Sequence, residues 1–203
     1  MDTLRAASPK DFAAAEFLTR DAFWNVYKPG CDEHLILHQF RSRPEFLAEL
    51  EYVIADENGL AAHIMYCRAL LRSPAGNVSA LMFGPVSVRP DRQRQGLGSR
   101  IIRFTLEKAE ALGHGAVVIT GSPAYYHRFG FEAASSRLIR LAALPPEADA
   151  PFFMVKELRP GFLPHRPFTF QEPEGYTVDA QALEAFEKQF PPRKKERRPG
   201  QLA

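Results

Sequence analysis

The chain has little cysteine and no long apolar run. Its 203 residues include two cysteines, Cys31 and Cys67, which are too few for a disulfide framework or a cysteine-rich zinc site. No apolar stretch approaches the ~20 residues that a membrane-spanning helix needs. The N-terminal segment also lacks the apolar core of a secretion signal. These absences predict a reduced protein of the cytoplasm, with no membrane partner.

The chain also has no strong excess of charge of one sign. Its formal net charge is +2, and residues 191–203 hold five of the 26 Lys and Arg residues but one of the 24 Asp and Glu residues. The rest is therefore slightly acidic, whereas a nucleic-acid-binding body normally presents a basic face. We predict a disordered, solvated tail at 191–203. A tail that binds nucleic acid, a membrane surface or an acidic partner is the weaker alternative.

The pattern of apolar residues predicts a mixed α/β domain. Glu57-Asn58-Gly59 separates two apolar runs and indicates a β-hairpin, and Gly84-Pro85 interrupts the strand that follows. Ser8 and Asp11 indicate the start of a first helix, whose apolar stripe we place at Ala14, Leu18 and Ala22. We expect strands at 4–6, 52–56, 60–71, 78–88, 116–120 and 152–158, and helices after 8, after 32, at 97–112, at 123–129 and at 179–190.

The segment from Val86 to Gly98 carries the strongest functional signal. A strand enters a loop rich in Arg and Gln, and Gly96 and Gly98 stand where the next helix begins. The first N–H groups of a helix have no partner within the helix and attract anions, and glycine lets a phosphate come close to the backbone. We therefore predict a pyrophosphate site, with Arg92 and Arg94 adding long-range attraction. The alternative is a glycine pair that only permits a tight turn.

Two other nucleotide-binding patterns do not fit this segment. A dinucleotide-binding loop would need a third glycine at position 101, which is Ile101, and the Gly-Lys-Ser/Thr of a phosphate-binding P-loop is absent.

Two motifs together resemble one family. Val86-Ser87-Val88-Arg89-Pro90 followed by Gln93-Arg94-Gln95-Gly96-Leu97-Gly98 resembles motif A of the GNAT superfamily of N-acetyltransferases. Pro123-Ala124-Tyr125-Tyr126-His127-Arg128-Phe129-Gly130-Phe131 resembles motif B, in a form typical of a bacterial subfamily of predicted acetyltransferases. The resemblance implies the GNAT fold: a central mixed, twisted sheet of about six to seven strands flanked by helices. It implies a GNAT domain at 1–158, with 159–190 as a C-terminal extension packed on that domain.

The resemblance also implies an activity and a site. The enzyme would move an acetyl group from acetyl-CoA, its co-substrate, to a primary amine that attacks directly in a ternary complex. The backbone of Val86 and Val88 would pair with the pantetheine arm, and the Val88 N–H would polarise the thioester carbonyl. Tyr126 would be the general acid that protonates the CoA thiolate, and Ser122 stands where the family often has an Asn that contacts pantetheine. The pyrophosphate would be held by Gln93, Arg94, Gln95, Gly96, Leu97 and Gly98.

The chemistry of a thioester is consistent with this role of Tyr126. A thiol ionises near pH 8.5 and a tyrosine near pH 10, so a neutral tyrosine can protonate the leaving sulfur with little loss of driving force. The alternative is that Tyr126 only packs the short helix; we read Phe129 and Phe131 as core. A general base is not evident, because 78–83 has no carboxylate or imidazole. The open candidates are His63, acting through water, and the group Asp32, Glu33, His34 and His38.

Other readings remain open at this point. The protein would be a non-catalytic acyl-CoA-binding or interaction module if no base exists. His34 and His38 are spaced by four residues without a third ligand, so we expect no metal site. The acceptor pocket is expected around 23–38 and in the segment after Arg159. There Phe162, Phe168, Phe170 and Tyr176 would form an apolar wall, part of the core or a contact of a homodimer.

Overall fold

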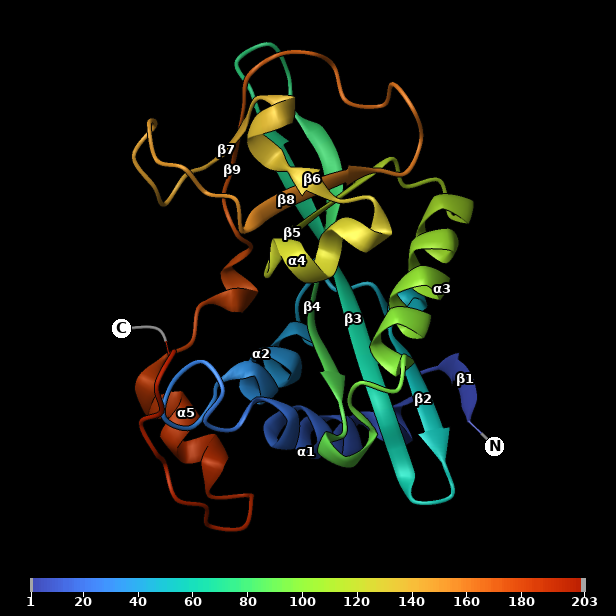
Figure 1. Cartoon of the computed structure of the whole chain (residues 1–203), viewed down its shortest axis with the longest axis vertical. Coiled ribbons are helices and arrows are strands. Elements are labelled where there is room, and N and C mark those ends of the chain that lie inside the picture. Colours follow the sequence, from blue (N-terminus) through green and yellow to red (C-terminus); the bar gives the residue numbers. More distant parts are fainter. Residues whose placement is uncertain (1, 202–203) are drawn as a thin grey trace. The chain divides into compact units, whose positions relative to one another are not determined.

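The structure is a computed structural model that describes residues 2–201, and it divides into two compact units (Figure 1). The first unit contains the chain up to Met65, then Pro85–Ile102, then the chain from Glu174 onward. The second contains Tyr66–Gly84 and Arg103–Pro173. Two strands and one helix run from one unit into the other, and each unit is described by itself below.

The elements form a mixed α/β fold, as predicted. The strands follow the order β1-β2-β3-β4-β5-β8-β6 in a nine-stranded sheet, with β9 paired to β3 and to β7. The helices are α1 (Phe12–Phe23), α2 (Glu33–Phe40), α3 (Leu97–Ala111), α4 (Pro123–Tyr126) and α5 (Ala180–Glu187). The strands are β1 (Thr3–Ala6), β2 (Tyr52–Asp56), β3 (Gly59–Arg72), β4 (Val78–Val88), β5 (Ala116–Thr120), β6 (Glu132–Ala133), β7 (Ile139–Leu141), β8 (Phe153–Glu157) and β9 (Phe168–Phe170).

In the first unit, β1, β2 and the beginning of β3 form an antiparallel sheet. Strand β2 pairs with β3 from Tyr52–Ile64 to Asp56–Gly59, with a register shift after Ile54. The Asp56 Oδ1 accepts a hydrogen bond from the Asn58 N–H at 2.8 Å, and Gly59 has a φ of 105°, which glycine adopts without strain. These local features explain why the sequence predicts this hairpin correctly.

Helix α1 buries a different stripe from the one expected. Its buried residues include Ala15, Leu18 and Thr19, whereas Ala14 is exposed and Ala22 is half-buried. The reason is that a spacing of four residues drifts by about 40° per step around a helix of 3.6 residues per turn, so Ala14 lies at the edge of the face that Ala15, Leu18 and Thr19 bury. The capping residues are as predicted, since the Ser8 N–H donates to Asp11 Oδ2 at 2.8 Å.

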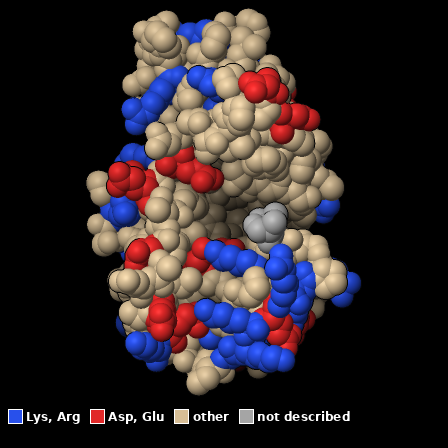
Figure 2. Space-filling model, turned by 90° about the vertical axis from the view of Figure 1, so that its left-hand side faces the viewer, with Lys and Arg blue, Asp and Glu red and all other residues tan. Residues whose placement is uncertain are grey.

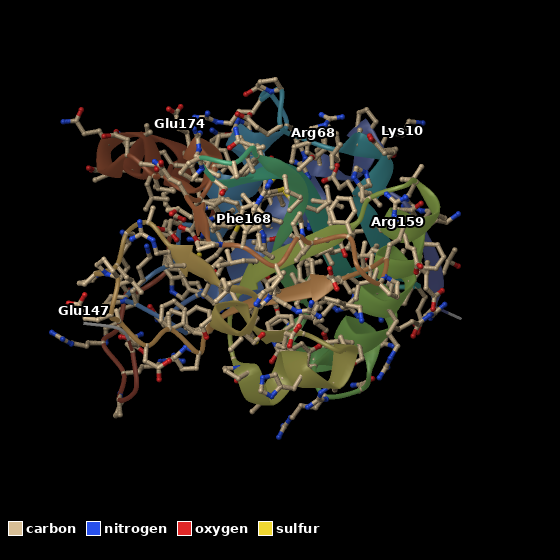
Figure 3. All side chains as sticks on the ribbon, turned by 90° about the horizontal axis from the view of Figure 1, so that it is seen from above. Lys10, Arg68, Glu147, Arg159, Phe168 and Glu174 are labelled. Carbon is tan, nitrogen blue, oxygen red and sulfur yellow. The ribbon has the colours of Figure 1, made fainter. Side chains whose placement is uncertain are left out.

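In the second unit, β4 and β5 are parallel and β5 and β8 are antiparallel. Leu81 pairs with Val117 and Met82 with Val118, and β5 then pairs along its whole length with β8. Strand β9 is parallel to β7, and Phe168 and Phe170 are almost fully buried. Figure 3 shows Phe168 inside the structure, while Glu147 of the same unit lies at its edge. Phe168 and Phe170 are therefore core residues and do not form an exposed apolar wall.

Three short strands make the sheet larger than the predicted six to seven strands. Strands β6, β7 and β9 have two or three residues each, too few to show a period in the sequence. In α3 the expected apolar positions Leu97, Ile101, Thr105 and Ala109 are buried, but Leu112 lies beyond the end of the helix and is exposed. Each helix found within residues 2–201 is too short or too polar to cross a bilayer.

Candidate functional site

The end of β4 and the turn that follows lie in the first unit. Ser87 is fully buried, and its Oγ lies 2.8 Å from Thr19 Oγ1 on α1. Val86 and Val88, the predicted pantetheine partners, are half-buried. Because side chains alternate along a strand, Val86 and Val88 face away from α1. One face of this strand end is thus packed on a helix, and the other remains partly accessible.

The turn between β4 and α3 contains two residues in the left-handed region. Arg94 has a φ of 60° and Gly96 a φ of 85°, and a Cβ placed on Gly96 would meet no atom within 4 Å. The Arg100 N–H donates to the Gly96 oxygen at 2.9 Å, so the N–H groups of Leu97, Gly98 and Ser99 precede the first α-helical hydrogen bond. Left-handed turns at a helix N-terminus create concave groups of N–H donors that suit anions. This turn is open and has the form of such a cradle.

A network of ion pairs holds the turn in place. Arg89 donates from Nη1 to Asp56 Oδ1 at 3.1 Å and from Nη2 to Asp56 Oδ2 at 2.7 Å. Arg92 also pairs with Asp56, and with Asp2 at 2.9 Å. The hydrogen bonds from Arg89 lower the pKa of Asp56 to about 2. Arg92 therefore stabilises the turn through its ion pairs. The expectation that it attracts phosphate from a distance needs correction, because two carboxylates already balance its charge.

The other predicted residues of the turn have different surroundings. Gln93 donates from Nε2 to the Val88 oxygen at 3.1 Å, so the structure brings these two predicted site residues together. Gln95 accepts from Arg92 Nε at 3.0 Å and donates to the Asp91 oxygen at 2.9 Å. Arg94 is exposed, Leu97 is buried and Gly98 is half-buried. The side chain of Gln95 thus helps to hold the turn together, and its backbone N–H remains a candidate hydrogen-bond donor to the diphosphate.

Tyr126 and Ser122 lie in the second unit. The Tyr126 ring is half-buried among aromatic rings, with its centroid 5.0 Å from Tyr125 and 6.0 Å from both Phe83 and Phe131. Ser122 is exposed and is the N-cap residue of α4, where its carbonyl accepts the Tyr126 N–H at 3.1 Å. Phe131 is buried, as is Phe129 of the same motif, and both belong to the core as predicted.

A second tyrosine of this unit accompanies Tyr126. Tyr66 is fully buried, and its hydroxyl lies 3.0 Å from Thr105 Oγ1. Burial raises the pKa of Tyr66, and the negative charge of an ionised Tyr126 would raise it further. Tyr66 therefore stays neutral, and sequence reasoning did not single it out because it stands in an ordinary apolar strand.

The candidate bases of the first unit are occupied by structural contacts. His63 is fully buried with its Nε2 2.9 Å from Glu51 Oε1, and burial lowers its pKa. Arg41 donates to the same Glu51 oxygen at 2.7 Å. His38 is exposed and its Nδ1 lies 2.9 Å from Glu16 Oε1. His63 therefore contributes to the buried polar contacts in the core of the first unit.

His34 lies in a second buried cluster. Its Nδ1 is 3.5 Å from the Cys31 sulfur, and its Nε2 is 2.6 Å from Glu187 Oε1, although the direction is poor for a hydrogen bond. Burial lowers the pKa of His34 to about 4 and raises that of Cys31. Both groups are therefore neutral at physiological pH. Within residues 2–201 the structure contains no group of three His, Cys, Asp or Glu side chains suited to a metal ion.

The tail makes contacts that the composition does not reveal. Residues 191–201, part of the segment expected to be disordered, belong to the first unit and contact the end of α1, while residues 202 and 203 lie outside the described chain. The Trp24 Nε1 donates to the Lys194 oxygen at 2.9 Å, and Asn25 Nδ2 donates to the same oxygen at 3.1 Å. Arg193 also pairs with Asp21 at 2.6 Å. The main chain of the tail is thus held by side chains at the end of α1.

Comparisons with known proteins identify relatives over most of the chain. A family model described as "Acetyltransferase (GNAT) domain" matches residues 3–134. The "Uncharacterized N-acetyltransferase YjhQ" of Escherichia coli (strain K12) is 29% identical over 103 residues, which cover 50% of this chain. The match spans 57% of that relative's length.

Two solved structures have the same fold at low sequence identity. The GNAT family N-acetyltransferase YhbS from Escherichia coli, in complex with CoA, has a TM-score of 0.74 at 23% identity and covers 86% of this chain and 91% of its own. A GNAT family acetyltransferase from Brucella melitensis, in complex with acetyl-CoA, has a TM-score of 0.69 at 23% identity and covers 87% of this chain and 99% of its own. At this identity the likeness establishes the fold.

Proposed function

Since this chain belongs to the GNAT acetyltransferase family, we propose that it transfers an acetyl group from acetyl-CoA to a primary amine. The relatives bound to CoA and acetyl-CoA support the choice of the donor. In the proposed reaction the amine nitrogen attacks the thioester carbonyl, the carbon–sulfur bond breaks, and CoA leaves as a thiolate. The ammonium proton leaves to water.

The observation that carries the proposal is the open turn before α3. Gly96 has a positive φ and free space where a Cβ would lie, and the N–H groups of Leu97 and Gly98 come before the first α-helical bond. A diphosphate would accept hydrogen bonds from these N–H groups, and the positive end of the helix dipole would add to the attraction. The exposed Arg94 would contribute a further positive charge.

The end of β4 would position the pantetheine arm. The main chain at Val86 and Val88 would pair with the amides of pantetheine, and Ser122 of the second unit would donate a further hydrogen bond. The Val88 N–H would polarise the thioester carbonyl as the oxyanion forms, and one such donor contributes roughly 2.7–4 kcal/mol to transition-state stabilisation.

Tyr126 would give its hydroxyl proton to the CoA thiolate and would then take a proton back from water. A tyrosine is less acidic than a thiol by about 1.5 pKa units, so the transfer is uphill by about 2 kcal/mol, a small cost for a proton transfer within a fixed site. The aromatic rings around Tyr126 support a fixed position for the hydroxyl. Direct attack is supported by the burial of Cys31 and Cys67, which leaves neither thiol accessible as an acyl carrier.

The test is thiol release from acetyl-CoA in the presence of a panel of primary amines. We expect release that depends on the amine, with initial-rate patterns of a sequential mechanism. Release that is absent with every amine, together with measurable CoA binding, would favour a non-catalytic acyl-CoA-binding module. Release without amine that leaves an acetylated protein would contradict direct attack.

A further inference from the structure

The C-terminal segment 191–201 of the first unit is basic, and side chains near the end of α1 hydrogen-bond to its backbone. Asn25, which is 3% exposed, accepts the Glu196 N–H at its Oδ1 over 3.0 Å and donates to the Lys194 oxygen at 3.1 Å. Trp24 donates to the same oxygen, and Arg20 donates to the Pro191 oxygen at 3.2 Å. Buried polar groups of the unit are thus used to hold the main chain of the tail.

The charged side chains of this segment remain in solvent. The exposed fractions are 43% for Arg193, 84% for Lys194 and 55% for Arg198. Figure 2 shows Lys and Arg side chains gathered in the lower part of the face that carries α5 and the tail, with some acidic ones among them. A tail that served only to cover the end of α1 would not need cations at these positions.

These cations border a cavity that also reaches the beginning of the turn between β4 and α3. The cavity has a volume of about 390 Å³. Pro90 and Gln93 of the turn lie on its wall, together with the end of α1. Arg193, Lys194 and Arg198 line the same cavity, as do the carboxylates Asp21 and Glu196. Gln93, the first residue of the site proposed for the diphosphate, and the basic tail therefore line the same cavity of the first unit.

The ion pairs inside the cavity are weak enough to be exchanged. Glu196 lies 3.3 Å from Lys194 and 3.4 Å from Arg198, and all three side chains are solvent-exposed. Exposed pairs contribute ~0–1 kcal/mol, whereas a phosphate offers Arg two parallel charge-assisted hydrogen bonds. A phosphate dianion would thus replace the carboxylates as partner of these cations.

Coenzyme A carries a phosphate at the required place. Its 3′-phosphate is attached to the ribose that bears the diphosphate, so a diphosphate held at Gln93–Gly98 brings the 3′-phosphate into the surroundings of the turn. We propose that Arg193, Lys194 and Arg198 bind the 3′-phosphate of coenzyme A, which makes the C-terminal segment part of the coenzyme site. This inference rests on the proposed function, because it requires that the turn holds the diphosphate.

The experiment is isothermal titration of the full chain with CoA and with dephospho-CoA, which lacks the 3′-phosphate. The wild type should bind CoA roughly tenfold more tightly than dephospho-CoA, the size of a few charge-assisted contacts at an exposed site. R198A should reduce this preference about threefold, and R193A/K194A/R198A should bring the ratio close to one. The matched control is R197A, which removes the neighbouring arginine that does not line the cavity.

Each outcome separates the two ideas. If the wild type binds CoA and dephospho-CoA equally, or if R197A and R198A have the same effect, the 3′-phosphate site is wrong and the proposed function stands. If the wild type binds neither compound, the proposed function fails and this inference with it. D21N provides a second route, since it releases Arg193 from its carboxylate. It should tighten CoA binding and leave dephospho-CoA binding unchanged, and equal changes for both would also overturn the inference.

Discussion

The ring of Tyr126 occupies the space in which a Cβ of residue 121 would lie, and residue 121 is a glycine. A Cβ at position 121 would come within 2.5 Å of the Tyr126 Cε2 and within 3.1 Å of its Cδ2. The first distance is shorter than any real carbon contact, so a residue larger than glycine at this position has to move the ring. Gly121 thereby fixes where the Tyr126 hydroxyl is placed within the second unit.

Gly121→Ala should therefore lower turnover without removing coenzyme binding. Displacing a reacting group by about 1 Å costs roughly 100-fold in rate, so we expect kcat to fall between about tenfold and 100-fold. Steady-state kinetics with acetyl-CoA and the best amine would measure this. Gly115→Ala is the matched control, since a Cβ there would lie 2.2 Å from the Phe162 ring, in the same unit. It should lower stability with little change in kcat, and an equal loss of kcat in both variants would argue against a special role of Gly121.

Tyr126→Phe removes the proposed proton donor and keeps the ring. General acid catalysis contributes roughly 10²–10⁴-fold, so kcat should fall by at least about 100-fold while the dissociation constant of acetyl-CoA stays nearly constant. Tyr125→Phe is the control, because its ring packs against Tyr126 at 5.0 Å and keeps that contact without the hydroxyl. Unchanged turnover of Tyr126→Phe would remove this residue from the mechanism.

Asp56→Asn tests whether the ion pairs around the turn support coenzyme binding. Asp56 accepts from both Arg89 and Arg92, so its loss removes the carboxylate that joins the two guanidinium groups and leaves each with one other acidic partner, Asp91 or Asp2. We expect acetyl-CoA to bind more weakly by about fivefold or more, the size of a modest coupling between neighbouring sites. Asp91→Asn removes an exposed partner of Arg89 and should have a smaller effect. Titration calorimetry would compare the affinities of the two variants for acetyl-CoA. Equal affinities would show that the ion pairs of Asp56 do not support coenzyme binding.

The stability of the chain should fall in acid because of His34. Its pKa is about 4 in the folded state, below the ordinary value of 6.5, because burial disfavours the charged form. As the pH falls below about 6.5, the unfolded state binds a proton that the folded state does not, and the difference stops growing near pH 4. The loss in unfolding free energy over this range is roughly 2–4 kcal/mol.

Urea unfolding of the wild type and of His34→Gln between pH 4 and pH 7.5 would measure this effect. The variant should lose less stability toward acid than the wild type, and the pH dependence of His63 cancels because both proteins contain it. His38→Gln is the control, since His38 is 54% exposed. Parallel curves for wild type and His34→Gln would contradict the assignment.

The sequence predicts the elements that carry local signals. The β2–β3 hairpin, β4, α3 and β5 were predicted because a turn residue, an apolar run or a helix start stands within each of them. Strands β7 and β9 were not predicted, because a three-residue strand such as Ile139–Leu141 depends on its distant partner at Phe168–Phe170. Nothing in the local pattern of either strand indicates that pairing.

The same limit applies to the candidate site. Glycine at position 96 permits the positive φ found there, but the positive φ of Arg94 in the same turn has no signal in the residue type. The half-buried setting of Tyr126 is consistent with its motif. The role of Arg92 was not predicted correctly, because its partners Asp56 and Asp2 stand 36 and 90 residues away in the sequence. The contacts of the tail were missed for a related reason, since Trp24 and Asn25 bind a main-chain oxygen, which every residue type provides.

The central claim is that the turn before α3 holds the diphosphate of coenzyme A, and Gly98→Glu tests it most directly. A glutamate in the first turn of α3 adds a side chain and a negative charge where the diphosphate would lie. Ala111→Glu is the control, because it adds the same charge at the exposed far end of the helix. In calorimetric titrations with acetyl-CoA, we expect no detectable binding to Gly98→Glu and unchanged binding to Ala111→Glu. Wild-type affinity in a folded Gly98→Glu protein would contradict the account.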